Sequence, residues 1–304
     1  MLAIDILSPC FEFIKKRFFP INKSYWLKLG FVSLISTRSG VNTQIGRGIN
    51  SFSKFGNFIK KYWVFLLGIS GIGLVLGFLW NIVQNTFLFI FLDSILKGKV
   101  KIKKGFGKHV KKGVSLFYFQ LLIGLAFLLL ISIIALPAII VYFSGNTPSG
   151  IATVLYIIVA VLVFFLMLMT VICINLLVYY LVIYEMYISN LKFKPALRNT
   201  IDLCKKEYKE VLMFILFKVL ISIGAGVTII LILIPVLIIF MIIAGIFAVP
   251  LILVGNLVIG LIIGLPIAII LFLVFIYTMA VVTVPVTGYL QYYSYRFMKE
   301  VKKL

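Results

Sequence analysis

Long apolar runs alternate with short basic segments along the chain. Three stretches contain no Asp, Glu, Lys or Arg: Tyr62–Leu92, Gly113–Tyr184 and Val219–Tyr295. A helix that crosses a bilayer needs about 20 consecutive, predominantly apolar residues. The first stretch is long enough for one such helix, and each of the other two is long enough for two. The pattern therefore predicts five long membrane spans.

Turn signals divide the longer stretches into helical hairpins. The uncharged sequence SGNTPSG at residues 144–150 separates Val114–Phe143 from Ile151–Tyr184. The last apolar run, Val211–Gly288, contains a break near Pro250–Asn256 that carries Pro and Gly, residues that mark turns. We therefore expect two antiparallel pairs of long helices after the first span.

A shorter apolar segment, Tyr25–Ser36, precedes the long runs. It has about a dozen residues, which is short for a span, so it either crosses the membrane with help from flanking residues or lies in the interface. We prefer the crossing. The predicted fold is an all-α polytopic transmembrane helical bundle with about six spans, five long and one short, and with basic amphipathic segments between the hairpins.

The chain is expected to form a single domain with two parts. Residues 1–61 hold a basic amphipathic segment, the short apolar segment and a Ser-, Gly- and Asn-rich linker at Thr37–Asn57 that reads as a flexible loop;. Residues 62–304 form the helical membrane domain. Basic stretches recur before apolar hairpins, which suggests three repeats of one unit, although chance similarity between membrane helices is the alternative.

Composition and charge narrow the class of protein. Of the 304 residues 63% are hydrophobic and 12% charged, with 29 Lys and Arg against 8 Asp and Glu, a net charge of +21. A soluble domain is about half apolar, so a soluble enzyme is excluded. Three cysteines without CxxC spacing argue against a disulfide scaffold or a zinc site. No readout motif accompanies the lysines, so nucleic acid is not an expected partner.

The distribution of Lys and Arg predicts the orientation in the membrane. Positive residues stay on the cytoplasmic side in short loops. The loop at 144–150 has none, whereas 94–112, 189–210 and the C-terminal tail are basic. We therefore expect a multi-pass protein of the cell membrane with 144–150 outside and both termini cytoplasmic.

The ionisable residues do not form a recognisable catalytic constellation. All eight acids lie at or outside the predicted helix ends, and His109, the single histidine, falls in the lysine-rich loop, where we expect it to be solvated or lipid-facing. Asp93 and Glu185 follow apolar runs and precede basic stretches, so we expect them to form structural ion pairs; the alternative is a paired gate or ion site. No catalytic residue, metal ligand or cofactor is predicted, and the chain is not expected to be an enzyme.

The basic segments are candidate sites for anionic lipid. A cluster of four to eight Lys or Arg beside a membrane helix is typical of headgroup binding, and the alternative is that the charges serve orientation alone. The candidate headgroup contacts are Lys97, Lys99, Lys101, Lys103, Lys104, Lys108, Lys111 and Lys112.

A second candidate site consists of polar residues at membrane depth. Lys218 is the one charge inside an apolar run; its side chain either extends to the interface or serves a pore or substrate site. The asparagines of this set form hydrogen bonds between helices or line a polar pathway. The candidate residues are Lys218, Asn81, Asn85, Asn175 and Asn256.

Three blocks of the chain resemble a known family. They are FFPINKSYWLKLGFVSLI, FLFIFLDSILKGKVKIKKGFGKHVKKGVSLFYFQL and PVTGYLQYYSYRFM, with Trp26, Asp93, Phe106, Pro285 and Tyr292–Tyr293. This pattern is similar to an uncharacterised family of archaeal polytopic membrane proteins, which is in turn similar to the membrane domain beside some glycerophosphodiester phosphodiesterases. The resemblance implies a membrane location and fold but no catalytic residue.

Two functions are therefore open. The first is a non-enzymatic membrane-organising protein that engages anionic lipid headgroups, a membrane partner or a second copy of itself. The second is a transporter or permease for a small solute or a lipid, because transporters are often built from repeats.

Overall fold

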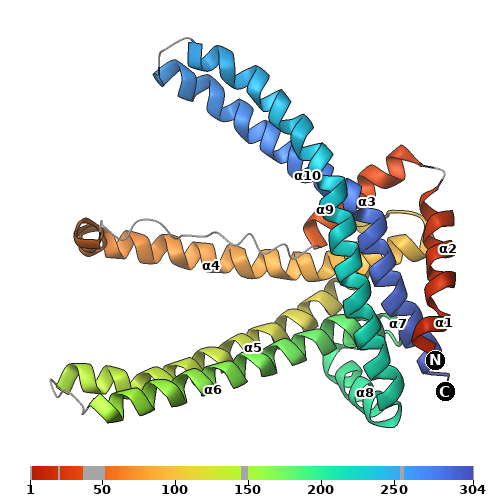
Figure 1. The fold of residues 1–304 in the computed structure, drawn as a ribbon, viewed down its shortest axis with the longest axis horizontal. Helices are drawn as coiled ribbons and strands as arrows, with labels where there is room; N and C mark the ends of the chain where they lie inside the picture. Colours follow the sequence, from red (N-terminus) through yellow and green to blue (C-terminus); the bar gives the residue numbers. More distant parts are fainter. Residues whose placement is uncertain (1, 20, 37–51, 145–149, 254–256, 304) are drawn as a thin grey trace. The chain divides into compact units, whose positions relative to one another are not determined.

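The computed structural model describes residues 2–19, 21–36, 52–144, 150–253 and 257–303, and every element of regular structure in these ranges is helical (Figure 1). The elements are α1 (Leu2–Asp5), α2 (Leu7–Phe18), α3 (Lys23–Ser36), α4 (Phe52–Lys97), α5 (Ile102–Ser144), α6 (Gly150–Leu177), the π-helical turn η2 (Val178–Val182), α7 (Ile183–Ile188), α8 (Phe193–Lys206), α9 (Tyr208–Leu253) and α10 (Leu257–Val301).

Among the described residues, five helical segments are long and apolar enough to cross a membrane, which confirms the five long runs predicted from the sequence. They are Gly68–Lys97, Ile102–Val141, Thr153–Ile188, Tyr208–Phe247 and Gly264–Val301. α5 ends at Ser144 and α6 begins at Gly150, while α9 ends at Leu253 and α10 begins at Leu257. Most of the two predicted turns, at residues 145–149 and 254–256, lies outside the described residues.

The first long helix begins earlier than the sequence pattern predicted. Residues 52–57 belong to α4 and not to a loop, while residues 37–51 of the predicted linker lie outside the described residues. Phe52, Phe55 and Ile59 follow a helical spacing;, so the signal was present but was hidden by the neighbouring Ser, Gly and Asn.

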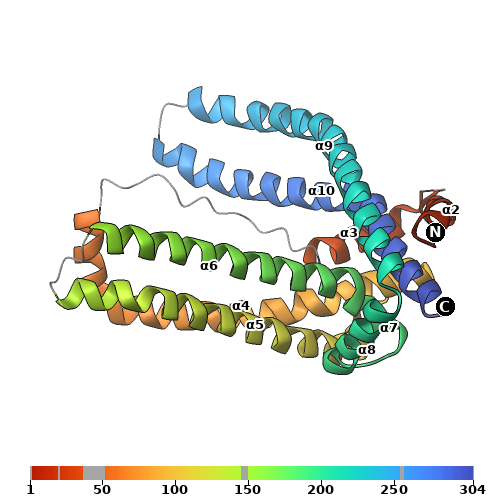
Figure 2. The same ribbon diagram turned by 60° about the horizontal axis from the view of Figure 1, so that its bottom comes forward.

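The chain divides into two compact units that interleave along the sequence. Unit 1 comprises Met1–Lys16, Val114–Val227 and Thr287–Leu304, and unit 2 comprises Arg17–Gly113 and Thr228–Val286. In unit 1, α5 and α6 run side by side as an antiparallel hairpin (Figures 1 and 2). In unit 2, α9 and α10 form a second hairpin, where the rings of Phe240 and Phe275 lie 5.1 Å apart.

Burial changes abruptly along the four helices of these hairpins. No described residue is fully buried in residues 118–143 of α5, 150–177 of α6, 219–247 of α9 or 264–283 of α10. These stretches correspond to roughly 30–45 Å of helix at 1.5 Å per residue, which matches the thickness of a bilayer. Exposed Leu, Ile, Val and Phe dominate them, so hydrocarbon is the environment that they require.

The buried residues gather at the other ends of the same helices. Buried positions end at Phe117 on α5 and at Lys218 on α9, and they begin at Val178 in η2 and at Val284 on α10. Most basic segments are also found at these ends. Each long helix therefore has an exposed apolar stretch and a continuation that is packed against protein.

The short helix α3 lies where these two regions meet. It packs along α4, with the rings of Phe31 and Phe87 6.4 Å apart, and its Leu27 carbonyl accepts a hydrogen bond of 2.8 Å from the Tyr277 hydroxyl of α10. Gly30 allows the close approach, because a Cβ there would overlap Val281. With 14 residues α3 is shorter than a typical span, so the sixth span stays a prediction.

The turn between α4 and α5 depends on Gly98. Its φ of 67° is a left-handed conformation that favours glycine at the end of a helix, and its N–H donates to the Ser94 carbonyl over 2.9 Å. Arg17 donates from Nη2 to the Leu96 carbonyl over 2.7 Å, which satisfies another group of the last helical turn. A Cβ on Gly98 would overlap the Arg17 guanidinium.

Gly98→Ala should therefore destabilise the protein, by about 1–2 kcal/mol for the backbone conformation and more if Arg17 is displaced. Gly107→Ala is the matched control, because Gly107 lies within α5 with open space around it. This variant should be more stable than the unmodified protein by roughly 0.5–1 kcal/mol. Thermal unfolding in detergent, followed by circular dichroism, measures both. A Gly98→Ala midpoint at or above that of Gly107→Ala would contradict this account of the turn.

Candidate functional site

The predicted headgroup segment comprises the end of α4 and the first turns of α5, all in unit 2. Most of it belongs to the two long helices, because α4 extends to Lys97 and α5 begins at Ile102. Seven of the eight candidate lysines are exposed, and the eighth, Lys112, is buried. The exposed residues are Lys97, Lys99, Lys101, Lys103, Lys104, Lys108 and Lys111.

Asp93 neutralises part of this cluster. Its carboxylate lies 2.7 Å from Lys97 Nζ and 3.9 Å from Lys108 Nζ, which confirms the ion pairing expected at the end of this helix. None of the ion pairs recorded among the described residues involves the other five exposed lysines. The outer part of the segment therefore presents a positive charge that no carboxylate within ion-pairing distance offsets.

Two residues of the segment face the interior instead. The His109 ring stacks on Phe89, with centroids 6.0 Å apart, and Lys112 Nζ lies 5.9 Å from the centroid of the same ring. His109 is 0% exposed, so the expectation of a solvated or lipid-facing histidine was wrong. The close packing of α5 on α4, where Gly113 meets Thr86, draws this face of α5 inward.

Lys218 lies in unit 1 and is 4% exposed. Its ammonium donates to the Leu290 carbonyl over 2.9 Å and to Ser294 Oγ, both on α10. It also faces aromatic rings, with Nζ 4.8 Å from the centroid of Tyr180 and 5.7 Å from that of Tyr184. Such cation–π contacts stabilise a desolvated ammonium by about 2 kcal/mol.

This arrangement differs from the extension to the interface that the sequence suggested, and the pore or substrate role of Lys218 stays a prediction. The amine does not extend along its own helix to an exposed end, and it is surrounded by protein groups. Lys218 is the last buried residue on α9 before the exposed apolar stretch, and it joins α9 to α10 and to the π-helical turn η2. These contacts connect α9 to α10 at the edge of the membrane region.

The asparagines of the second candidate site are distributed over both units. Asn85 donates to Asn81 over 2.9 Å within α4 of unit 2, and Asn175 donates to the Val171 carbonyl within α6 of unit 1. Asn256 lies outside the described residues. The recorded contacts join Asn81 to Asn85, but they do not bring Lys218 together with the asparagines.

Glu185 organises a buried polar cluster in unit 1. Its side chain is 1% exposed, and Lys302 Nζ lies 3.0 Å from Oε1 and 3.1 Å from Oε2. Ser189 and Asn199 also donate to Oε1, over 2.8 and 3.3 Å. The cluster connects α7, α8 and the end of the chain. An ion pair was expected at Glu185, but its partner is 117 positions away, and no local pattern identifies it.

The cysteines are free, as expected. Burial raises the pKa of Cys10 to about 12, although Arg296 acts in the opposite direction. Burial also raises the pKa of Cys204. Both thiols therefore stay protonated at neutral pH, which makes them poor nucleophiles.

Lys302→Met should destabilise the protein, because it leaves the buried Glu185 carboxylate without its cation. Removing one partner of a fully buried pair costs 3–5 kcal/mol, and we expect about 2 kcal/mol because Lys302 is 34% exposed;. Lys303→Met is the matched control, since its pair with Glu300 is largely exposed and contributes less than about 1 kcal/mol. Equal unfolding midpoints for the two variants would show that the Glu185 cluster does not stabilise the fold.

Comparison with known proteins places the chain in a family. Residues 1–303 match the model of a family described as Family of unknown function (DUF7544). No curated protein and no solved structure has significant similarity to the chain. The match covers nearly the whole sequence, including every contact described above, and the chain belongs to this family of unknown function.

Proposed function

We propose that the chain is a multi-pass, non-enzymatic protein of the cell membrane that binds anionic lipid headgroups and organises the membrane around it. The observation that carries this proposal is the turn between α4 and α5. There, Lys99, Lys101, Lys103, Lys104 and Lys111 are exposed at the end of two helices that are apolar enough to cross a bilayer. Each Lys near the surface attracts anionic lipid by about 1 kcal/mol.

The contacts of the N-terminus support a topology with both ends on one side. The Tyr293 hydroxyl near the end of α10 donates to the Ala3 carbonyl over 2.9 Å, and Phe13 stacks on Tyr292 at 4.0 Å. Termini on one side require an even number of crossings, whereas the long spans number five among the described residues. A further crossing then falls between α2 and α4, where the short apolar segment lies. The basic residues near both ends favour a cytoplasmic location for both termini.

The proposal is tested by native mass spectrometry of the protein purified from vesicles that contain phosphatidylcholine and phosphatidylglycerol. We expect selective retention of phosphatidylglycerol. Changing Lys99, Lys101, Lys103 and Lys104 together to Gln should lower that selectivity tenfold or more. Each Lys contributes about 1 kcal/mol, and a tenfold change in affinity corresponds to 1.4 kcal/mol. The same four positions changed to Arg keep the charge and should keep the selectivity.

Two results would overturn the headgroup proposal. One is the absence of retained phosphatidylglycerol on the unmodified protein. The other is equal retention by the Gln and Arg variants, which would leave the lysines with a role in orientation alone.

A transporter is the alternative, and the buried Lys218 is the observation that favours it, since ionisable residues at membrane depth often serve transport. Lys218→Met keeps a similar volume, and Ser294 retains its bond to the Leu290 carbonyl. We expect the free energy of unfolding of this variant to lie within about 1 kcal/mol of that of the unmodified protein, because replacing buried charges by apolar residues is often nearly neutral. We also expect the variant to retain the same lipids. A folded Lys218→Met protein that loses a solute flux present in the unmodified protein would favour transport.

The resemblance to archaeal polytopic membrane proteins, and through them to the membrane domain beside glycerophosphodiester phosphodiesterases, is part of the same proposal. It agrees with a role in lipid binding without catalysis. Assembly with a membrane partner or with a second copy of the chain would extend the cationic surface, and native mass spectrometry reads the oligomeric state in the same experiment.

A further inference from the structure

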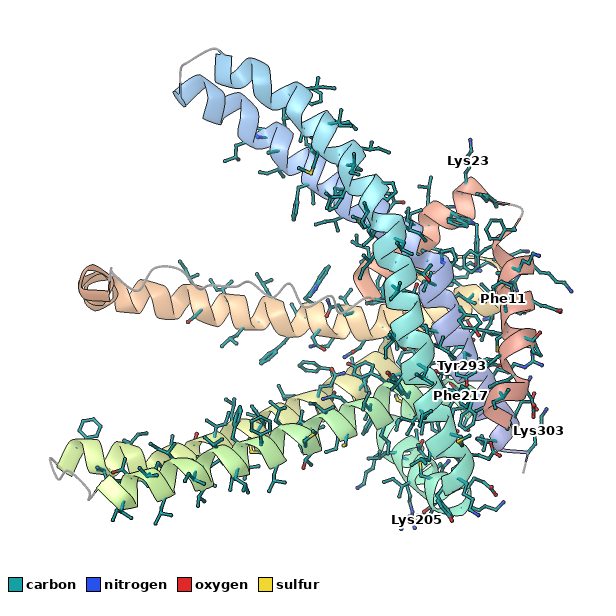
Figure 3. The ribbon with its side chains drawn as sticks, in the orientation of Figure 1. Phe11, Lys23, Lys205, Phe217, Tyr293 and Lys303 are labelled. Atoms are coloured by element: carbon teal, nitrogen blue, oxygen red, sulfur yellow. The ribbon has the colours of Figure 1, made fainter. Side chains whose placement is uncertain are left out.

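The helix α8 has two distinct faces. Phe193, Ala196 and Thr200 are buried on one face, where α8 packs against α7 and η2. Lys194, Arg198 and Lys205 are exposed. At 100° per residue these three cations fall within about 40° of one another, on the side opposite the buried face. Lys205 extends away from the helix in Figure 3.

The beginning of α8 lies level with the edge of the membrane region. Phe193 stacks on Phe119 with ring centroids 3.9 Å apart, and its N–H donates to Ser115 Oγ over 3.0 Å. Residues 118–143 of α5 form one of the exposed apolar stretches. Lys192 and Lys194, on either side of Phe193, therefore lie at the depth where headgroups replace hydrocarbon.

The orientation of α8 about its own axis is fixed by Glu185. Asn199 donates to Glu185 Oε1, and Lys302 closes the same cluster from the end of the chain. Asn199 lies about 120° around the helix from the row of cations. Because α8 is held by this hydrogen bond and by its buried face, it cannot turn its basic row toward the protein without breaking these contacts. Glu185 is thus a positioning residue for this surface.

We propose that α8 is a membrane-surface helix whose row of Lys194, Arg198 and Lys205 binds the phosphate groups of anionic lipids. None of the ion pairs among the described residues involves these three side chains. Ile201 lies in the same row and is 38% exposed, and an apolar residue among cations suits the boundary between headgroups and acyl chains. This inference rests on the membrane location in the proposed function, but not on the lysines between α4 and α5.

Hydrogen exchange in nanodiscs tests the inference. The amides of residues 193–206 should exchange at least twofold more slowly in nanodiscs with phosphatidylglycerol than in nanodiscs of phosphatidylcholine alone. Arg198→Gln removes one charge from the row, and Lys206→Gln, the matched control, removes one charge from the same helix about 100° away from it. We expect the lipid-dependent protection to fall with Arg198→Gln and to persist with Lys206→Gln.

The outcomes separate this inference from the proposed function. Equal loss of protection in both variants, or protection that does not depend on phosphatidylglycerol in the unmodified protein, would overturn the role of α8. Phosphatidylglycerol selectivity in native mass spectrometry would then still test the α4–α5 lysines independently. An unchanged unfolding midpoint of Arg198→Gln verifies that the variant remains folded. If its α8 amides keep their lipid-dependent protection, Arg198 does not bind the headgroups.

Discussion

The thickness of the hydrocarbon layer is the constraint on which the rest of this structure depends. Within it no water can satisfy backbone groups, so a spanning segment must be a helix with apolar side chains. The unburied stretches of α5, α6, α9 and α10 are about as long as that layer requires;. The same helices continue beyond these stretches, and their additional turns supply about half of the buried residues described in the chain.

The buried charges of unit 1 stand in these additional turns and connect neighbouring helices. Lys218 connects α9 to α10 through Leu290 and Ser294, and Glu185 connects α7 and α8 to Lys302. Desolvating a charge is expensive, and both sites offset that cost with several partners, aromatic rings around Lys218 and three donors around Glu185. The basic surface outside depends on these inner contacts, because they determine which cations remain exposed.

The five long spans found among the described residues follow from apolar length alone, so the sequence predicts them. Other features depend on tertiary contacts. The turn at Gly98 depends on a contact with Arg17. His109 and Lys112 are buried because α5 packs on α4. The partner of Glu185 is a residue at the far end of the chain. The predicted start of α4 was wrong for another reason. Neighbouring polar residues made the helical spacing of Phe52 and Phe55 hard to recognise.

Spin labels at single cysteines in liposomes test the central claim most directly, that the unburied stretches lie in the bilayer and the basic ends outside it. Labels at Ile230 and Met241, both highly exposed on α9, should be more accessible to oxygen than to a water-soluble nickel complex. Labels at Lys205 and Lys303 should show the reverse. Preferential accessibility of positions 230 and 241 to the nickel complex would contradict the account.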